Sequence, residues 1–146
     1  MLHLSGHNVV TLDNLSNGFR DSVLFGEFIE GDIADRAFLC ELFSEYYFDG
    51  VIHFAFSLQV GASVVHPSMY YENNFNNTLT LLSAMTDESI KSFIFSSTAA
   101  IFGEPEYVPI DELHSKQPIN PYGHTKLMVE QVFNDFDNAY GLKSIC

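Results

Sequence analysis

The chain has 146 residues, of which 47% are hydrophobic and 14% aromatic, and it carries 6 Lys and Arg against 19 Asp and Glu. This length and composition suit one folded domain and exclude a disordered chain. The formal net charge of -13 argues against binding to nucleic acid or to an anionic membrane, because both partners require a basic protein surface.

Several features bear on the compartment and on metal binding. Cys40 and Cys146 are the only cysteines, which is too few for the disulfide framework of a secreted domain. The sequence shows neither a signal peptide nor a run of about 18 apolar residues. The six histidines include no pair at the spacing of metal ligands. We therefore expect a cytoplasmic protein with reduced thiols, no membrane segment and no metal.

Short apolar runs that are typical of buried strands alternate with amphipathic helices along the chain. The alternation predicts an α/β fold with a parallel sheet, because strands buried on both faces are continuously apolar. No internal repeat or linker interrupts it, so we assign residues 1–146 to one domain. Strands are predicted at 8–12, 27–30, 51–55 and 93–95, and helices at 34–47, 68–85 and 121–140.

Most of the predicted strands end in polar residues. Asp13 and Asp32 follow the first two strands, Ala55 and Phe56 end the third, and the run Ser-Ser-Thr at 96–98 ends the fourth. In open parallel sheets, ligands bind outside the carboxyl ends of the strands. The sequence therefore predicts a ligand site at this edge of the sheet.

The helix predicted at 121–140 carries a tyrosine and a lysine at a spacing that has a chemical use. Tyr122 and Lys126 are four residues apart and so share one helix face. A free tyrosine has a pKa near 10, and lowering it by about three units takes roughly 4 kcal/mol of phenolate stabilisation. A neighbouring ammonium is able to contribute that, and the Thr98 hydroxyl could bind the same substrate oxygen. Alone, this spacing also occurs in surface pairs that have no role.

Two segments carry a resemblance to a known family: FIFSSTAAIFG at 93–103 and NPYGHTKLMVE at 120–130. Together with the stretches at 12–17, 30–33, 51–55 and 70–74, they resemble the extended short-chain dehydrogenase/reductase family, and within it the UDP-sugar 4-epimerases. This resemblance implies a Rossmann-like parallel sheet with helices on both faces, NAD as cofactor and a UDP-sugar as substrate.

The resemblance also implies where NAD would lie. Asp13 would bind the adenosine ribose and disfavour the 2′-phosphate of NADP, and Asp32 would border the adenine. A cap or turn is the alternative role for each aspartate, and core packing is the alternative for Phe54. Asn73 would contact the cofactor from the long helix. The residues assigned in this way to NAD binding are Asp13, Asn14, Leu15, Ser16, Asn17, Gly18, Asp32, Ile33, Phe54, Ala55, Phe56, Leu58, Asn73, Ser96, Tyr122 and Lys126.

By the same resemblance, Tyr122, Lys126 and Thr98 would be the catalytic residues. Tyr122 would remove the proton of the sugar 4-hydroxyl while hydride moves from C4 to the nicotinamide. The 4-keto sugar would then turn over and take the hydride back on its other face. Lys126 would lower the pKa of Tyr122 and bind the nicotinamide ribose. Thr98 and Tyr122 would bind the substrate.

Two departures from the family pattern concern the stretch at 54–58. Where related epimerases usually carry Gly and Lys, this chain has Phe56 and Leu58. Phe56 adds bulk beside the cofactor, and Leu58 removes a positive charge. We therefore expect weaker cofactor binding.

The resemblance implies further parts that are not found in this sequence. The family begins with a strand and a glycine-rich turn that approaches the pyrophosphate, whereas this sequence begins in what resembles the following helix. It ends at Cys146, before the part that would grip the UDP-sugar. We interpret residues 1–146 as a partial NAD-binding Rossmann domain whose C-terminal substrate domain is absent. The strands at Val9 and Ile52 should then expose unpaired backbone.

Other functions remain open beside the epimerase. A dehydratase or reductase of the same family is one alternative, although dehydratases tend to have an Asp-Glu pair where this chain has Ala99 and Ala100. A remnant that folds or dimerises without turnover is another. In the family, helices corresponding to 75–82 and 127–136 form a four-helix interface, so a homodimer is expected.

Overall fold

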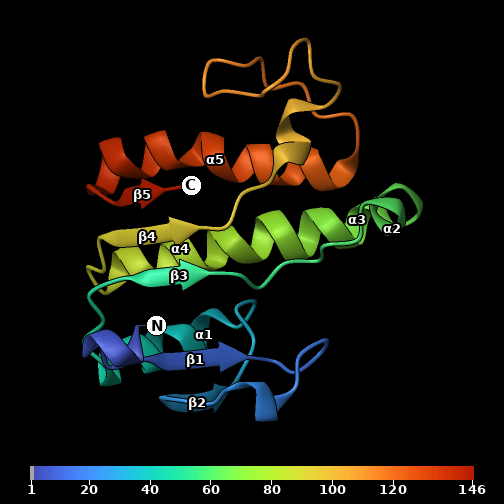
Figure 1. The fold of residues 1–146 in the computed structure, drawn as a ribbon. Coiled ribbons are helices and arrows are strands. Elements are labelled where there is room, and N and C mark those ends of the chain that lie inside the picture. The colour runs from blue at the N-terminus through green and yellow to red at the C-terminus, as the bar shows by residue number, and fades with distance from the viewer. Residues whose placement is uncertain (1) are drawn as a thin grey trace.

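The computed structural model describes residues 2–146 as parallel strands joined by helices (Figure 1). The α/β class is confirmed, and the helix predicted at 121–140 is observed with those bounds. The principal elements are β1 (Val10–Asp13), β2 (Glu27–Glu30), α1 (Arg36–Glu45), β3 (Val51–His53), α2 (Val60–Val65), α3 (Pro67–Tyr70), the π-helical segment η3 (Tyr71–Asn76), α4 (Asn77–Asp87), β4 (Ser92–Phe95), α5 (Pro121–Tyr140) and β5 (Lys143–Ile145). Short 3-10 turns lie at η1 (His3–Ser5), η2 (Arg20–Ser22) and η4 (Ala99–Phe102).

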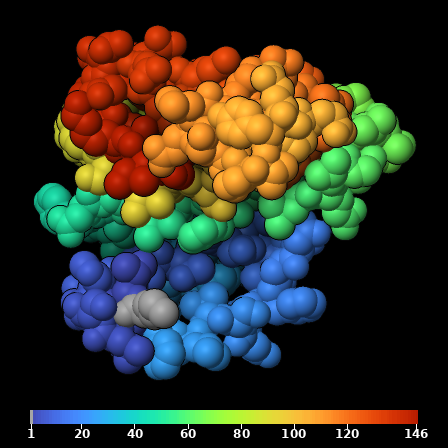
Figure 2. Space-filling view, turned by 45° about the horizontal axis from the view of Figure 1, so that its top comes forward, coloured from blue at the N-terminus to red at the C-terminus, as the bar shows by residue number. Residues whose placement is uncertain are grey.

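The strands form two separate parallel sheets. One sheet pairs β1 with β2, and the other has the order β3-β4-β5. Within the described residues β1 and β3 are therefore each hydrogen-bonded along one side only, as the sequence predicted for these two strands. Figure 2 shows the consequence on one face of the molecule, where the N-terminal segment, in blue, lies as a lobe beside the teal and green segments.

The core lies between the three-stranded sheet and helices α1, α4 and α5. Phe93 and Phe95 of β4 are buried and meet the ring of Phe133 in α5 edge to face, at centroid distances of 5.6 and 5.4 Å. Leu82 in α4 and Leu39 in α1 are fully buried in the same cluster. Apolar burial of this kind is the main source of stability.

The opposite face of the three-stranded sheet has less helix cover than the sequence predicted. The strand register places Ile52, Ile94 and Ile145 in one row. Their exposed fractions are 38%, 44% and 69%. Helices on both faces would bury such a row, so the described residues cover mainly one face of this sheet.

The predicted helix at 68–85 is not one continuous α-helix. Its first turn is α3, a π-helical segment follows at Tyr71–Asn76, and α4 completes it. π-Helical turns are rare and occur mostly as bulges near functional sites. Asn74 belongs to this segment and is fully buried. The period of the apolar residues alone did not indicate this interruption.

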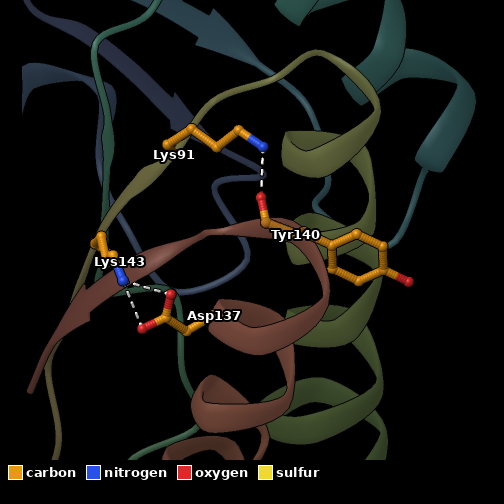
Figure 3. A network of polar contacts seen from close by, with 4 residues as sticks. All are labelled: Lys91, Asp137, Tyr140 and Lys143. Atoms are coloured by element: carbon orange, nitrogen blue, oxygen red, sulfur yellow. Dashed lines mark hydrogen bonds and ion pairs between the residues drawn. The ribbon is translucent and has the colours of Figure 1, made fainter.

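Local capping explains where α5 begins and ends. At its start, Pro121 supplies the fixed φ of a first helical turn, and the Asn120 side chain accepts a hydrogen bond from Gly123 N at 2.8 Å. At its end, Gly141 has φ +71° and turns the chain into β5. A lysine cap holds this turn: Lys91 donates to the Tyr140 carbonyl at 2.5 Å (Figure 3).

Figure 3 also shows Lys143 bonded to both carboxylate oxygens of Asp137, at 2.6 and 2.8 Å. This pair ties β5 back to the last turn of α5. No described helix is long and apolar enough to cross a membrane.

Candidate active site

A cavity of about 280 Å³ lies at the carboxyl ends of β1, β2 and β3. This is the edge of the sheet at which the sequence predicted a ligand site. The cavity brings together most residues that the sequence analysis assigned to NAD, but not Leu15, Leu58, Ser96, Tyr122 or Lys126. Its lining consists of Leu12, Asp13, Asn14, Ser16, Asn17, Gly18, Gly31, Asp32, Ile33, Phe54, Ala55, Phe56, Ser57 and Asn73.

The loop after β1 is folded around Asp13. One carboxylate oxygen of Asp13 accepts a hydrogen bond from Leu15 N at 2.7 Å, which supports the positive φ of 55° at Leu15. A Cβ at Gly18 would lie 3.2 Å from the other Asp13 oxygen. The absence of a side chain at Gly18 therefore keeps this carboxylate open toward the cavity. Asp13 thus acts as a turn cap, and its other carboxylate oxygen accepts no hydrogen bond from residues 2–146, so it could meet a ligand hydroxyl.

Asp32 is more fully used by the protein itself. One oxygen accepts from Ala34 N at 2.9 Å, and the other accepts from the Asn14 amide, also at 2.9 Å. The turn-forming role that the sequence left open for Asp32 is therefore present. The Asn14 bond joins the loops after β1 and β2, and both residues line the cavity.

Charge and size indicate which part of a dinucleotide the cavity fits. Its described lining includes the carboxylates of Asp13 and Asp32 and no lysine or arginine. Carboxylates accept hydrogen bonds from ribose hydroxyls but repel phosphate. Its volume is at the lower limit for a small-molecule site. The cavity therefore suits the adenosine end of NAD, and its side chains provide no cation for the pyrophosphate.

A neighbouring asparagine that the sequence analysis missed organises the wall of the cavity. Asn74 is fully buried, accepts from Ser57 N at 2.8 Å and donates to the Ser57 carbonyl at 3.1 Å. It also donates to Thr125 Oγ1 at 3.4 Å. Asn73 is half-buried and donates to Ser57 Oγ at 3.2 Å. Asn73, which the sequence analysis assigned to the cofactor, lines the cavity, and the fully buried amide is that of Asn74.

The three predicted catalytic residues lie beside the end of β4. Tyr122 and Lys126 are buried in the first turns of α5, with exposed fractions of 8% and 1%. Thr98 is half-buried, and its hydroxyl oxygen accepts from Ala100 N at 3.2 Å. A Cβ at Gly123 would lie 2.6 Å from the Ala100 carbonyl, so glycine permits this close approach of α5 to the turn after Thr98.

Lys126 does not contact Tyr122 through a hydrogen bond but donates to the Ser96 carbonyl at 2.6 Å. Burial lowers the pKa of the Lys126 ammonium to about 7, while the Glu130 carboxylate acts in the opposite direction. Glu130 itself accepts from Ser97 Oγ and from Lys116 Nζ, the latter at 2.6 Å. Sequence reasoning did not assign a role to Glu130. Its position four residues after Lys126 places both side chains on one helix face, and this spacing could have indicated the interaction.

Parallel strands joined by helices, with a polar cavity at their carboxyl ends, define the class of α/β nucleotide-binding domains. The chain belongs to the NAD dependent epimerase/dehydratase family, which it matches over residues 1–146. It is 48% identical over 140 residues to a UDP-glucose 4-epimerase of Rhizobium leguminosarum bv. trifolii, covering 96% of this chain and 43% of that protein. A UDP-glucose 4-epimerase of Rhizobium meliloti is 44% identical, covering 99% of this chain and 44% of that protein.

Solved structures give the same result. A UDP-glucose 4-epimerase from Brucella ovis in complex with NAD has a TM-score of 0.96 at 45% identity, covering 98% of this chain and 44% of that one. The enzyme from Bifidobacterium longum in complex with NAD+ and UDP has a TM-score of 0.91 at 36% identity, covering 94% and 44%. The chain thus spans less than half the length of these relatives.

Proposed function

We propose that this chain carries the NAD-binding and catalytic residues of a UDP-glucose/UDP-galactose 4-epimerase, which inverts C4 of the sugar through a transient 4-keto intermediate. The observation that carries the proposal is the buried pair of Tyr122 and Lys126 at the start of α5, beside the strand end that leads to Thr98. The likeness to UDP-glucose 4-epimerases over 96% of the chain supports it.

The residues of the cavity fit part of the cofactor. Asp13 would accept from the adenosine ribose hydroxyls, Asp32 and Ile33 would border the adenine, and Asn73 would approach from the helix side. When bound, NAD supplies a reversible acceptor for the hydride of C4. Ser96 and Lys126 would lie at the nicotinamide end. They are joined there, because Lys126 in α5 donates a hydrogen bond to the carbonyl of Ser96, the residue that follows β4.

The protein side chains would manage the proton and the sugar oxygen. Tyr122 would take the proton of the 4-hydroxyl through its phenolate oxygen, and a charged Lys126 would stabilise that phenolate. Thr98 would donate to the same sugar oxygen and hold C4 toward the hydride acceptor. Burial of Tyr122 and Lys126 would keep water away from the keto intermediate.

The substrate class and the assembly are part of the same proposal. A related structure was solved with UDP-glucose bound, which supports a UDP-sugar here. A homodimer through α4 and α5, and a cytoplasmic location with Cys40 and Cys146 reduced, complete it. Both thiols are free in the structure.

The decisive experiment joins calorimetric titration with NAD to an assay of UDP-galactose conversion, both on the 146-residue chain. We expect NAD binding, and any conversion that the chain supports should be lost in Tyr122→Phe. Tyr140→Phe is the matched control, because Tyr140 lies at the far end of the same helix and is 52% exposed. Conversion that survives in Tyr122→Phe would refute the assigned role.

A second candidate is a folded chain that does not turn over. The separation of the two sheets between β1 and β3 favours it, because these strands would flank the pyrophosphate-binding turn implied by the family. Absence of any heat with NAD from the folded chain would support this candidate over the epimerase.

A further inference from the structure

The Lys126 ammonium is enclosed by aromatic rings. Its Nζ lies 3.1 Å from the ring centroid of Phe56 and 4.7 Å from that of Phe95. Among the described residues, its hydrogen-bond partner is the Ser96 carbonyl, at 2.6 Å. A cation over the face of a ring is attracted by the ring quadrupole, and the attraction is larger where water is excluded. Lys126 is 1% exposed, so this contact is of the desolvated kind.

Packing on its other sides holds the Phe56 ring in this place. The His53 ring lies 4.1 Å away between centroids, and the Phe95 ring meets Phe56 edge to face at 5.2 Å. His53 is itself buried and bonded to Thr78. The ring of Phe56 is therefore fixed between a buried imidazole and a buried ammonium.

Phe56 also lies between the two halves of the candidate site. It is half-buried and lines the cavity that contains Asp13 and Asp32. Lys126, which it covers, does not line that cavity. A ligand that occupies the cavity consequently meets the ring of Phe56 before it can reach the ammonium.

We infer that Phe56 is a positioning residue for Lys126, and that its ring closes the lysine end of the cavity, so that a ligand reaches the ammonium only after the ring moves. The placement of the ammonium by the ring does not depend on any ligand, so it does not rest on the proposed function. The second part, displacement of the ring by a dinucleotide, rests on the proposed function.

The first test measures Lys126 directly, without any ligand. Competitive acetylation with acetic anhydride across a pH series, read by peptide mass spectrometry, gives the midpoint and the rate for each of the four lysines. Lys91 and Lys143 are exposed and serve as internal standards for folding and reagent. We compare the wild-type chain with Phe56→Ala, Phe56→Leu and the control Phe54→Ala.

Each variant has its own expected result. Phe56→Ala admits water, so the Lys126 midpoint should rise by about one pH unit or more and its acetylation should become faster. Phe56→Leu keeps the apolar cover without a ring face, so the midpoint should fall below the wild-type value. Phe54→Ala is a control for the cavity wall, because Phe54 lines the same cavity and is 69% exposed. The rings over the ammonium are those of Phe56 and Phe95, so this change should leave the Lys126 midpoint at the wild-type value.

The outcomes that overturn the inference are equally distinct. If Phe56→Ala leaves the Lys126 midpoint and rate at the wild-type values, the ring does not place the ammonium. If that variant fails to fold, as circular dichroism and the two standard lysines would show, Phe56→Leu decides. An unchanged midpoint in Phe56→Leu overturns the inference.

The second test addresses the closure of the cavity by titrating wild-type and Phe56→Ala with NAD. We expect about tenfold tighter binding to Phe56→Ala, because the ring no longer has to move first. Equal affinity would overturn the closure. If no variant binds NAD, the proposed function fails, whereas the acetylation midpoints still decide whether Phe56 places Lys126.

Discussion

The side-chain amide of Asn74 forms two hydrogen bonds with the backbone of Ser57. The Asn74 side-chain oxygen accepts from Ser57 N at 2.8 Å, and the side-chain nitrogen donates to the Ser57 carbonyl at 3.1 Å. Ser57 lies in the loop after β3, whereas Asn74 lies in the π-helical segment. The pair therefore fixes the loop that carries Phe56 against the helix layer.

Replacing Asn74 with alanine should destabilise the chain by about 2–4 kcal/mol, because two partly buried backbone groups of Ser57 lose their partners. Urea unfolding followed by circular dichroism measures the change. Asn76→Ala is the control: Asn76 is exposed, and its side chain donates to the exposed carboxylate of Glu72, so its effect should stay within about 0.5 kcal/mol. Equal effects of the two substitutions would contradict the role given to Asn74.

Acid should weaken the fold through His53. Burial first, and the charge of Lys126 second, lower the pKa of His53 from 6.5 to about 3. Below pH 6.5 the unfolded chain therefore binds a proton that the folded chain does not, so stability should fall as the pH drops from about 6.5 toward 3. The loss should reach several kcal/mol, and urea unfolding at each pH measures it. His53→Gln should have a flatter profile over this range, and parallel profiles would refute the assignment.

Raising the pH above 7 should stabilise the fold through Lys126. Its pKa is lowered from 10.5 to about 7 in the folded chain, so between these values the unfolded chain binds the extra proton. Stability contributed by this residue should therefore rise between pH 7 and pH 10, by on the order of 2–4 kcal/mol. Comparison with Lys126→Met isolates the pH-dependent contribution of Lys126 to the free energy of unfolding, because methionine does not titrate. An identical slope in both chains would show that Lys126 is not the source.

Gly123→Ala tests the close approach between α5 and the turn after Thr98. The added Cβ would lie 2.6 Å from the Ala100 carbonyl, so we expect a loss of about 1–3 kcal/mol in thermal or urea unfolding. Gly61→Ala is a matched control inside α2, where a Cβ would meet nothing within 4 Å. That change should be neutral or stabilising, because alanine favours helix.

Asp13→Asn tests the open carboxylate of the cavity. Asparagine can still accept from Leu15 N, so the loop should keep its fold, whereas the charge that would bind ribose hydroxyls is lost. We expect NAD affinity to fall about tenfold or more by calorimetry. Asp21→Asn, at an exposed position outside the cavity, should leave the affinity unchanged. A similar loss in both variants would indicate a general charge effect.

Much of this fold follows from local patterns. The strands at Phe28 and Phe93 and the helix that begins at Pro121 were predicted, because period and capping are encoded within a few neighbouring residues. The short helix α2 was missed, since six residues carry too little periodicity. The π-helical turn was missed because one extra residue moves the later apolar positions by a single place, and the steps of three and four residues in this segment accommodate that shift.

The site was predictable in part for the same reason. Asp13 and Asp32 could be placed at strand ends from the sequence, and both line the cavity. The contact between Phe56 and Lys126 joins residues that are distant in the chain, so no local pattern contains it. The resemblance indicated that Phe56 was unusual but not which group it would cover.

The ladder of β1 and β2 and the ladder of β3, β4 and β5 share no hydrogen bond within the described residues. The bonds between β1 and β2 can open without disturbing any bond among β3, β4 and β5. Amide protons of the two sheets should therefore exchange with deuterium at separate rates, those of the β1–β2 pair faster, because local opening of a two-stranded ladder requires less free energy than global unfolding. The chain would then behave as two units of unequal cooperativity linked through the packing of α1 on α4.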